Sequence, residues 1–321
     1  MALVSILIPC FNAERWVAQA IESALAQTWP EKEIIVVDDG STDGSLDVIK
    51  RYEGKIQWES GPNRGGNVAR NRLLQLAQGE WLQYLDAADY LLPDKIERQM
   101  EFLFRNKETD IVFGPVIWEY WSEEKTHQEL FQIPEPHDLW VLLARWYLPQ
   151  TGSPLWRRKA IIDVNGWKED QPCCQEHELY LRLMEAGKKF DYCPSAGAIY
   201  RQWSDQTVCK RNIREVHRRR LEIEQRVEDF LRLQNVLSPA RRWAINQARF
   251  ETARIAWQYN QQVAIEIINT IHSSDPRFIP GGIAASVSYR LLYRLLGFRI
   301  TEVMADFRRW IMEISLRKAT G

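Results

Sequence analysis

Acidic residues stand at two places where strands of the chain are expected to end. Asp38 and Asp39 close the β-branched run at 33–39, and Asp86 closes the run at 81–86. Because an open parallel sheet binds ligands at the carboxyl ends of its strands, both groups should face one cleft. Carboxylates there accept hydrogen bonds from ribose hydroxyls or a base, or hold a divalent cation that neutralises phosphates. The alternative is a plain turn, because Asp-Gly pairs are frequent turn residues.

The elements that must position these acids alternate between strand and helix. This alternation predicts an α/β fold of βαβ units with a mostly parallel sheet. We expect Asn12 and Ser41 to cap the helices that follow the first two strands. The expected strands are 4–9, 33–39, 55–60, 81–86 and two in 110–121 broken at Gly114-Pro115, and the expected helices follow Asn12 and cover 68–77, 95–105 and 176–187.

The last third of the chain differs in charge and in pattern. Residues 1–204 hold 22 Lys/Arg against 31 Asp/Glu, whereas residues 205–321 hold 20 against 12. The pattern predicts helices in 210–234, 240–272 and 286–318. We therefore expect a first domain over 1–205 and a basic α-helical region over 206–321.

Arginines and aromatic residues interleave in SYRLLYRLLGFR at 288–299. This segment, within 286–318, could lie on an anionic membrane surface with its Leu and Tyr side chains at the interface. It could equally pack as a helical cap on the first domain with Arg on the solvated face.

Composition excludes several classes of protein. A chain of 321 residues that is 45% hydrophobic and 26% charged fits a globular protein, not a disordered or collagen-like one. The net charge of −1 argues against a nucleic-acid binder. Five cysteines without CxxC spacing predict reduced thiols in a cytosolic chain, and no apolar run reaches the length of a membrane span. We interpret the opening MALVSILIPCF as a first strand and not as a signal peptide.

Two common nucleotide-binding patterns are missing from the sequence. No GxGxxG follows the first strand, and no Walker A loop occurs, which argues against a dinucleotide oxidoreductase and a P-loop enzyme. Gly65-Gly66 before a helix can present backbone N–H groups to a phosphate.

Several ordered blocks of the sequence resemble family 2 glycosyltransferases, which have the GT-A fold and invert configuration. The resemblance spans roughly residues 3–205. Its blocks are IPCFNAERWVAQAIESALAQTWPEKEIIVVDDGSTDGS, NRGGNVARNRLLQLAQGEWLQYLDAADYLLPDKIE, VNGWKED, QEHELYLRLMEAG and the dipeptide YR.

The resemblance implies a nucleotide site for the sugar donor. Pro9 and Phe11 lie where the family lines the base pocket, and Asp39 lies where a carboxylate reads the base, usually uracil. Arg70 lies where the family contacts the nucleotide, and Asp86 where it contacts ribose and metal. The alternative for Phe11 is a core aromatic residue, and for Arg70 a solvated helix residue.

The metal motif departs from the family pattern. The usual DADD string is here Asp86-Ala87-Ala88-Asp89, so alanine occupies the position of the direct metal ligand. We expect Mn²⁺ or Mg²⁺ to be held by Asp86 alone or with Asp89, and donor binding without metal is the other option. The family often has a histidine shortly after YR, but here Trp203 stands near that position.

The resemblance also implies the reaction. Glu176 matches the acid that removes the proton from the attacking hydroxyl, while Glu178 fits support of the helix start. The expected partners are a nucleotide sugar, with UDP favoured, and a glycan or lipid-linked acceptor. The expected setting is cell-envelope polysaccharide synthesis at the inner face of the plasma membrane. The competing interpretation is a catalytically impaired relative that binds nucleotide or glycan.

Overall fold

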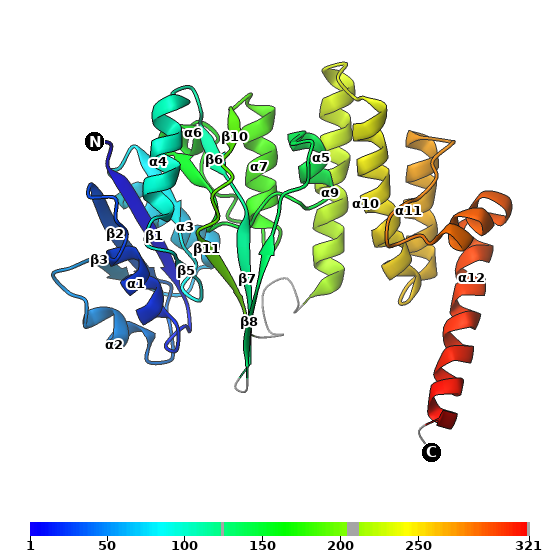
Figure 1. Ribbon diagram of the computed structural model, residues 1–321, viewed down its shortest axis with the longest axis horizontal. Helices are drawn as coiled ribbons and strands as arrows, with labels where there is room; N and C mark the ends of the chain where they lie inside the picture. The colour runs from blue at the N-terminus through cyan, green and yellow to red at the C-terminus, as the bar shows by residue number, and fades with distance from the viewer. Residues whose placement is uncertain (123–124, 204–211, 320–321) are drawn as a thin grey trace. The chain divides into compact units, whose positions relative to one another are not determined.

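The computed structural model describes residues 1–122, 125–203 and 212–319 and divides the chain into two compact units. The first unit is Met1–Arg219 and the second is Arg220–Gly321. Figure 1 shows strands in the blue-to-green part of the chain and helices alone in the yellow-to-red part. The domain boundary expected at 205/206 lies outside the described residues and stays a prediction.

A seven-stranded sheet forms the centre of the first unit, in the order β10-β6-β9-β4-β1-β2-β3. Four of its pairings are parallel, and only β9 runs antiparallel to both of its neighbours. The prediction of a mostly parallel sheet is therefore confirmed. Its strands are β1 (Val4–Cys10), β2 (Lys32–Asp38), β3 (Gln57–Ser60), β4 (Trp81–Tyr84), β6 (Ile111–Phe113), β9 (Leu155–Arg157) and β10 (Phe190–Tyr192).

The central strands are buried on both faces because helices connect them. In strand β1, Ile6 and Ile8 on one face and Leu7 on the other are all fully buried, as a parallel strand between helical layers requires. The helices of this unit include those expected from the sequence, with bounds shifted by one to a few residues. They are α1 (Val17–Leu25), α2 (Ser45–Lys50), α3 (Gly66–Leu76), α4 (Lys95–Arg105), α5 (Leu139–Ala144), α6 (Arg158–Asp163) and α7 (Gln175–Glu185).

A second, four-stranded sheet has the order β5-β11-β7-β8. Strand β11 (Ala198–Gln202) pairs in parallel with β7 (Val116–Trp121) and antiparallel with the short β5 (Tyr90–Leu91). Strand β8 (Thr126–Phe131) completes the sheet at its exposed edge. This sheet carries Tyr200 and Arg201 to the region that follows β4, because β5 begins only four residues after Asp86.

The two expected helix caps were wrong. Trp16 and Gly44 precede α1 and α2, and neither Asn12 nor Ser41 caps a helix. Instead the two loops bond to each other: Asn12 N–H donates to Ser41 Oγ at 3.0 Å, and Thr42 N–H donates to Asn12 Oδ1 at 2.8 Å. The polar side chains therefore tie together the loops that follow β1 and β2, at the carboxyl ends of these strands.

Gly40 is required by the loop after β2. Its φ is +73°, and an added Cβ would lie 2.4 Å from the Asn63 backbone nitrogen. Only glycine accepts both conditions, so this residue lets the loop at 61–65 approach Asp39.

The second unit contains helices α10 (Pro239–Trp257), α11 (Gln261–Ser274) and α12 (Val287–Ala319), and α9 (Ile213–Leu233) enters it from the first unit. Ser238 caps α10 by accepting from Arg241 N–H, and Pro239 stands in the first turn. The core of this unit contains Phe250, Trp257 and Phe298. Among the described residues, no helix has the length and apolar character needed to cross a bilayer.

Candidate active site

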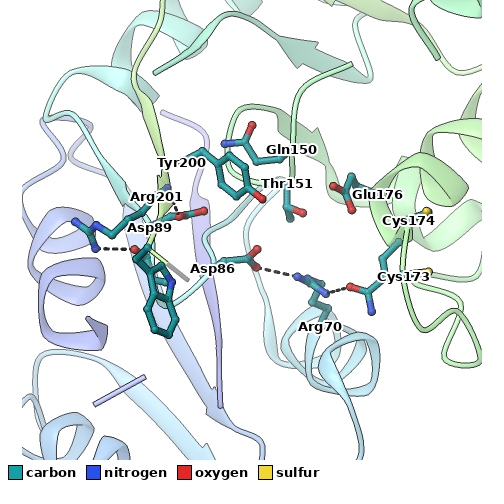
Figure 2. A pocket seen from close by; sticks show the side chains of 13 residues that line it. Arg70, Asp86, Asp89, Gln150, Thr151, Cys173, Cys174, Glu176, Tyr200 and Arg201 are labelled. Carbon is teal, nitrogen blue, oxygen red and sulfur yellow. Dashed lines mark hydrogen bonds and ion pairs between the residues drawn. The ribbon is translucent and has the colours of Figure 1, made fainter. Parts of the chain in front are cut away.

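A cavity of about 190 Å³ opens beside the ends of β4 and β11 and the start of α7. Figure 2 shows Asp86, Thr151, Glu176 and Tyr200 gathered around one space, with Arg70 below them in the view. The lining brings together residues that are far apart in the sequence. It consists of Arg70, Asp86, Ala88, Asp89, Gln150, Thr151, Cys173, Cys174, Gln175, Glu176, Tyr200, Arg201 and Trp203.

Arg70 is buried in α3, and its guanidinium connects three parts of the cavity wall. It donates to Asp86 Oδ1 at 2.8 Å, to Gln175 Oε1 at 2.9 Å and to Asn67 Oδ1 at 3.2 Å. Its charge also lies over the Trp167 ring, 4.9 Å from the ring centre. One cation thus sits at the base of the cavity with a fixed orientation, which suits an anionic ligand group.

Glu176 lies in the first turn of α7 and is half-buried. Burial raises the pKa of its carboxyl, and the negative charge of Asp86 adds to that rise. The backbone N–H of Glu176 and the charge of Arg70 oppose it. A carboxylate with a raised pKa accepts a proton more readily than an exposed glutamate does, which suits a general base.

Asp86 and Asp89 differ in environment although they are three residues apart. The Asp86 side chain is 37% exposed and faces the cavity. Asp89 is buried, and Arg201 N–H donates to its Oδ1 at 2.9 Å. Burial, together with the charge of Asp86, raises the pKa of Asp89 well above its usual range. Asp86 is therefore the accessible carboxylate, and Asp89 is a buried acid held by β11.

Arg201 fixes the loop that contains these acids. Its guanidinium donates to the Ala88 carbonyl at 2.6 Å and to Gln19 Oε1 at 2.7 Å, and it forms an ion pair with Glu119 at 2.9 Å. It also lies 4.2 Å from the centre of the Trp16 ring. The Ala88 position is thus held by its backbone, and its methyl group supplies no ligand atom.

A metal site must be assembled from few oxygen atoms here. Within 1–122, 125–203 and the described helices, no cluster of three or more His, Cys, Asp or Glu side chains is arranged to hold a metal ion. Asp86 Oδ1 is engaged by Arg70, which leaves its second oxygen toward the cavity. Mg²⁺ is commonly bound by one or two carboxylates together with the phosphates of a ligand. The Asp86 carboxylate therefore fits a cation that enters with a diphosphate.

Asp39 lies at a second cavity of about 170 Å³, lined also by Glu59, Gly61, Arg64 and Arg72. Both of its carboxylate oxygens accept backbone N–H groups, from Arg64 at 2.8 Å and Gly65 at 2.9 Å. Pro9 is half-buried in β1, and Phe11 follows it with 48% of its surface exposed. Phe11 is therefore not a core aromatic residue. Arg70 is buried and not a solvated helix residue.

Several residues of the site were not found from the sequence. Gln150 and Thr151 line the cavity from a segment that shows no periodic pattern. Gln175 orients Arg70, and the only signal was its place directly before Glu176. His177 stacks on Trp146 with ring centres 3.8 Å apart. Glu178 is buried and pairs with Arg182 at 2.8 Å, so it supports α7.

The mixed sheet with its acids at the strand ends defines a GT-A fold, and solved structures agree. The crystal structure of S. aureus TarS 1–349 in complex with UDP-GlcNAc matches with a TM-score of 0.65 and 15% identity, over 96% of this chain and 92% of that one. The mannosyltransferase PcManGT from Pyrobaculum calidifontis, in complex with GDP-Man and Mn²⁺, matches with a TM-score of 0.53 and 15% identity, over 95% and 87%.

The sequence comparisons place the first unit in a family. Residues 5–163 match Glycosyl transferase family 2, and over these residues the chain belongs to that family. Chondroitin synthase from Pasteurella multocida is 28% identical over 203 residues, which are 58% of this chain and 19% of that protein. The first curated relatives are matched over 19% to 44% of their own length.

Proposed function

We propose that this protein is an inverting glycosyltransferase that moves a sugar from a UDP-sugar to a hydroxyl of a glycan or lipid-linked acceptor. The observation that carries the proposal is the position of Glu176. It shares one cavity wall with the Arg70–Asp86 pair, and burial raises its pKa. A base and a fixed cation on one cavity are the groups that a displacement at a sugar phosphate needs.

The proposed reaction is a single displacement. The Glu176 carboxylate takes the proton of the acceptor hydroxyl while the oxygen of that hydroxyl attacks the anomeric carbon. The bond from that carbon to the phosphate oxygen breaks, and the nucleoside diphosphate leaves with the electron pair. Because attack comes from the face opposite the leaving group, configuration inverts and no covalent enzyme intermediate forms.

We assign the parts of the nucleotide-sugar donor to the two cavities. We assign the base to the Asp39 cavity, with Pro9 and Phe11 beside it, and the diphosphate and sugar to the cavity of Arg70 and Asp86. The uridine preference is supported by Asp39, which can accept an imide N–H, and by the UDP-GlcNAc complex of TarS. Arg70 stabilises the charge that develops on the leaving diphosphate.

We include a divalent cation, Mn²⁺ or Mg²⁺, in the proposal. Asp86 would hold it, and Asp89 would join only after its bond to Arg201 N–H is broken. A bound cation would neutralise diphosphate charge. The Mn²⁺ in the PcManGT complex supports this part of the proposal.

The proposed setting of the reaction is polysaccharide synthesis. The relative named chondroitin synthase, which matches over 203 residues, supports this setting. We propose that this chain acts at the inner face of the plasma membrane and touches it through residues 286–318. The basic charge of the last third supports contact with an anionic surface.

The second candidate is a catalytically impaired relative that binds nucleotide or glycan. It is favoured by Ala88, which stands at the usual ligand position. Thermal melting with UDP-GlcNAc, UDP and GDP-mannose, each with Mn²⁺, Mg²⁺ or EDTA, tests donor binding, because a ligand of the folded state raises the melting temperature.

Donor turnover then separates the two candidates. Glu176→Gln should lower release of UDP from the donor by about 10²- to 10⁴-fold while the melting shift with UDP persists. Glu185→Gln, at the other end of α7, is the control and should act like the wild type. Equal turnover by Glu176→Gln and wild type would remove Glu176 as the base. A UDP shift without any turnover would favour the impaired relative.

A further inference from the structure

The outer face of α12 carries apolar side chains that the second unit leaves uncovered. These side chains recur at intervals of three to five residues, except that the last two are adjacent, and they are between 44% and 75% exposed. They are Val287, Leu291, Leu295, Ile300, Val303 and Met304, and we name them the α12 stripe. An exposed apolar surface of this length on a globular unit is typical of an interaction site.

The opposite face of α12 is packed, so the stripe is not an effect of a loose helix. Tyr289, Tyr293 and Phe298 are buried in the core of the second unit. Glu302 is fully buried and accepts from Tyr289 Oη at 2.6 Å and from Arg254 Nε at 2.6 Å. The helix is thus held by one face, and the other face is left to meet a partner.

Gly297 divides α12 into two segments. Its φ of +74° is non-helical, and Figure 1 shows the chain change direction between the orange and the red segment. Val287, Leu291 and Leu295 lie on one side of the first segment, since they repeat every four residues. Ile300, Val303 and Met304 fall within about 100° on the second segment. Each segment is therefore amphipathic by itself.

Arginines line the edges of the stripe. At about 100° per residue, Arg299 and Arg308 fall on the two sides of the second segment's apolar residues, and both are exposed. Arg294, also exposed, lies beside Val287 and Leu291 on the first segment. Arginine places its charge in the headgroup region while its stem lies along apolar surface.

The charge of α12 distinguishes between two possible occupants. Residues 287–309 hold five Arg and two carboxylates. Glu302 bonds Arg254, and Asp306 accepts from Trp257 Nε1 at 2.8 Å, so both serve contacts inside the unit. A second copy would bring arginines against arginines, which opposes association. Anionic lipid headgroups complement the same arginines.

We propose that the α12 stripe lies in the plane of an anionic lipid surface, with its apolar side chains at the acyl boundary and Arg294, Arg299 and Arg308 at the phosphates. This inference deepens the membrane contact in the proposed function and rests on it. It adds the residues that enter the surface, the orientation of the helix and the charge of the lipid. Binding of this kind combines apolar burial with electrostatic attraction, so it should weaken with salt.

Vesicle co-sedimentation of the full chain tests the inference without donor or acceptor. One vesicle set is phosphatidylcholine alone, and the other contains about one third phosphatidylglycerol. The wild type should bind the second set and lose binding as salt rises. Val303→Glu should reduce binding at least about tenfold, because it places a charge at the acyl boundary. Ile255→Glu, the same change at a 47% exposed position of α10, should bind like the wild type.

The arginines have their own variants. Arg294→Gln with Arg299→Gln should weaken binding to anionic vesicles by about fivefold for each arginine removed. Arg277→Gln, at an exposed position before α12, is the control. The inference is overturned if the wild type does not bind anionic vesicles, or if Val303→Glu binds as well as Ile255→Glu. It is also overturned if sedimentation velocity shows a dimer that Val303→Glu dissociates while vesicle binding is absent. Release of UDP from the donor is measured without vesicles. It therefore tests the proposed transferase activity independently of membrane binding.

Discussion

Arg70 Nη2 lies 2.8 Å from Asp86 Oδ1 and joins helix α3 to the end of strand β4. Neither residue is isolated, because Arg70 also bonds Gln175, the residue before Glu176. One guanidinium therefore sets the relative positions of the accessible carboxylate and the helix that carries the proposed base.

Arg70→Lys should lower kcat/KM for donor turnover by about ten- to a hundredfold. Lysine has one compact ammonium group and cannot serve Asp86 and Gln175 with a planar fork. Hydrogen bonds to charged groups contribute about 1.5–3 kcal/mol each, which sets the expected range. Steady-state kinetics with UDP-GlcNAc gives the measurement. Arg98→Lys, in an exposed pair with Asp94 on α4, is the matched control; equal losses in both variants would deny Arg70 a special role.

The pH profile of kcat/KM should have an acidic limb that belongs to Glu176. Burial raises the pKa of this carboxyl above its ordinary value of 4.5, and a base works only when deprotonated. Activity should therefore fall as pH falls through that raised pKa. Initial rates measured across the acidic range give the limb, which should be absent from the residual activity of Glu176→Gln. A limb that persists in that variant would belong to another group.

The same pKa shift has a consequence for stability. Folding raises the pKa of this carboxyl, so the ionised form is less favourable in the folded state than in the unfolded state. Its ionisation therefore lowers the free energy of unfolding. This loss is absent at low pH and grows as pH rises from the unfolded toward the folded pKa. Glu176→Gln should accordingly melt at a higher temperature than the wild type near neutral pH, and the difference should shrink near pH 4, about the unfolded pKa. Thermal melts at the two pH values measure this. A lower melting temperature for Glu176→Gln near neutral pH would contradict the sign.

Asp86→Asn and Asp89→Asn should affect the cation differently. Asp86 is the accessible carboxylate, so its loss should raise the Mn²⁺ concentration needed for half-maximal turnover by about tenfold or more. Asp89 is buried and its pKa is raised, so Asp89→Asn should leave the Mn²⁺ requirement nearly unchanged. Metal titration of UDP release measures both. A larger metal effect in Asp89→Asn would make Asp89 the principal ligand.

The sequence predicted the elements whose signal is local. Strands β1, β2 and β4 are apolar runs, as expected. The acids at the ends of β2 and β4 were expected to face one cleft, but Asp39 and Asp86 line two different cavities. Strand β9 was not predicted as the antiparallel member between β4 and β6, because a segment of three residues, Leu155–Arg157, carries no pattern that identifies its partner strands. Its pairing depends on contacts far apart in the sequence, which no local pattern encodes.

Arg70, Asp86 and Glu176 were expected from the sequence to act at one site, and the structure brings all three to the wall of one cavity. Their roles in binding and catalysis stay predictions. The sequence did not show that Asp86 is accessible whereas Asp89 is buried. Asp89 is held by the backbone N–H of Arg201, which is 112 residues away along the chain. The capping roles of Asn12 and Ser41 failed for a similar reason, since each side chain found a partner in the other loop.

Buried charge in the second unit gives a prediction about stability alone. Arg249 and Glu228 form an ion pair whose side chains are 1% and 4% exposed, and Ser274 Oγ also donates to Glu228 at 2.6 Å. Arg249→Leu leaves the buried Glu228 carboxylate with the Ser274 hydroxyl and with the cation of Arg232, whose side chain is 46% exposed. Unfolding free energy should fall by about 3–5 kcal/mol.

The control for this prediction shares the same carboxylate. Arg232→Leu removes the partly exposed member of the group and should cost less than about 1 kcal/mol. Urea unfolding followed by circular dichroism measures both variants, and the helical unit should report the loss most strongly because it contains all three residues. If the two arginine variants lose equal stability, burial does not govern the strength of the Arg249–Glu228 pair.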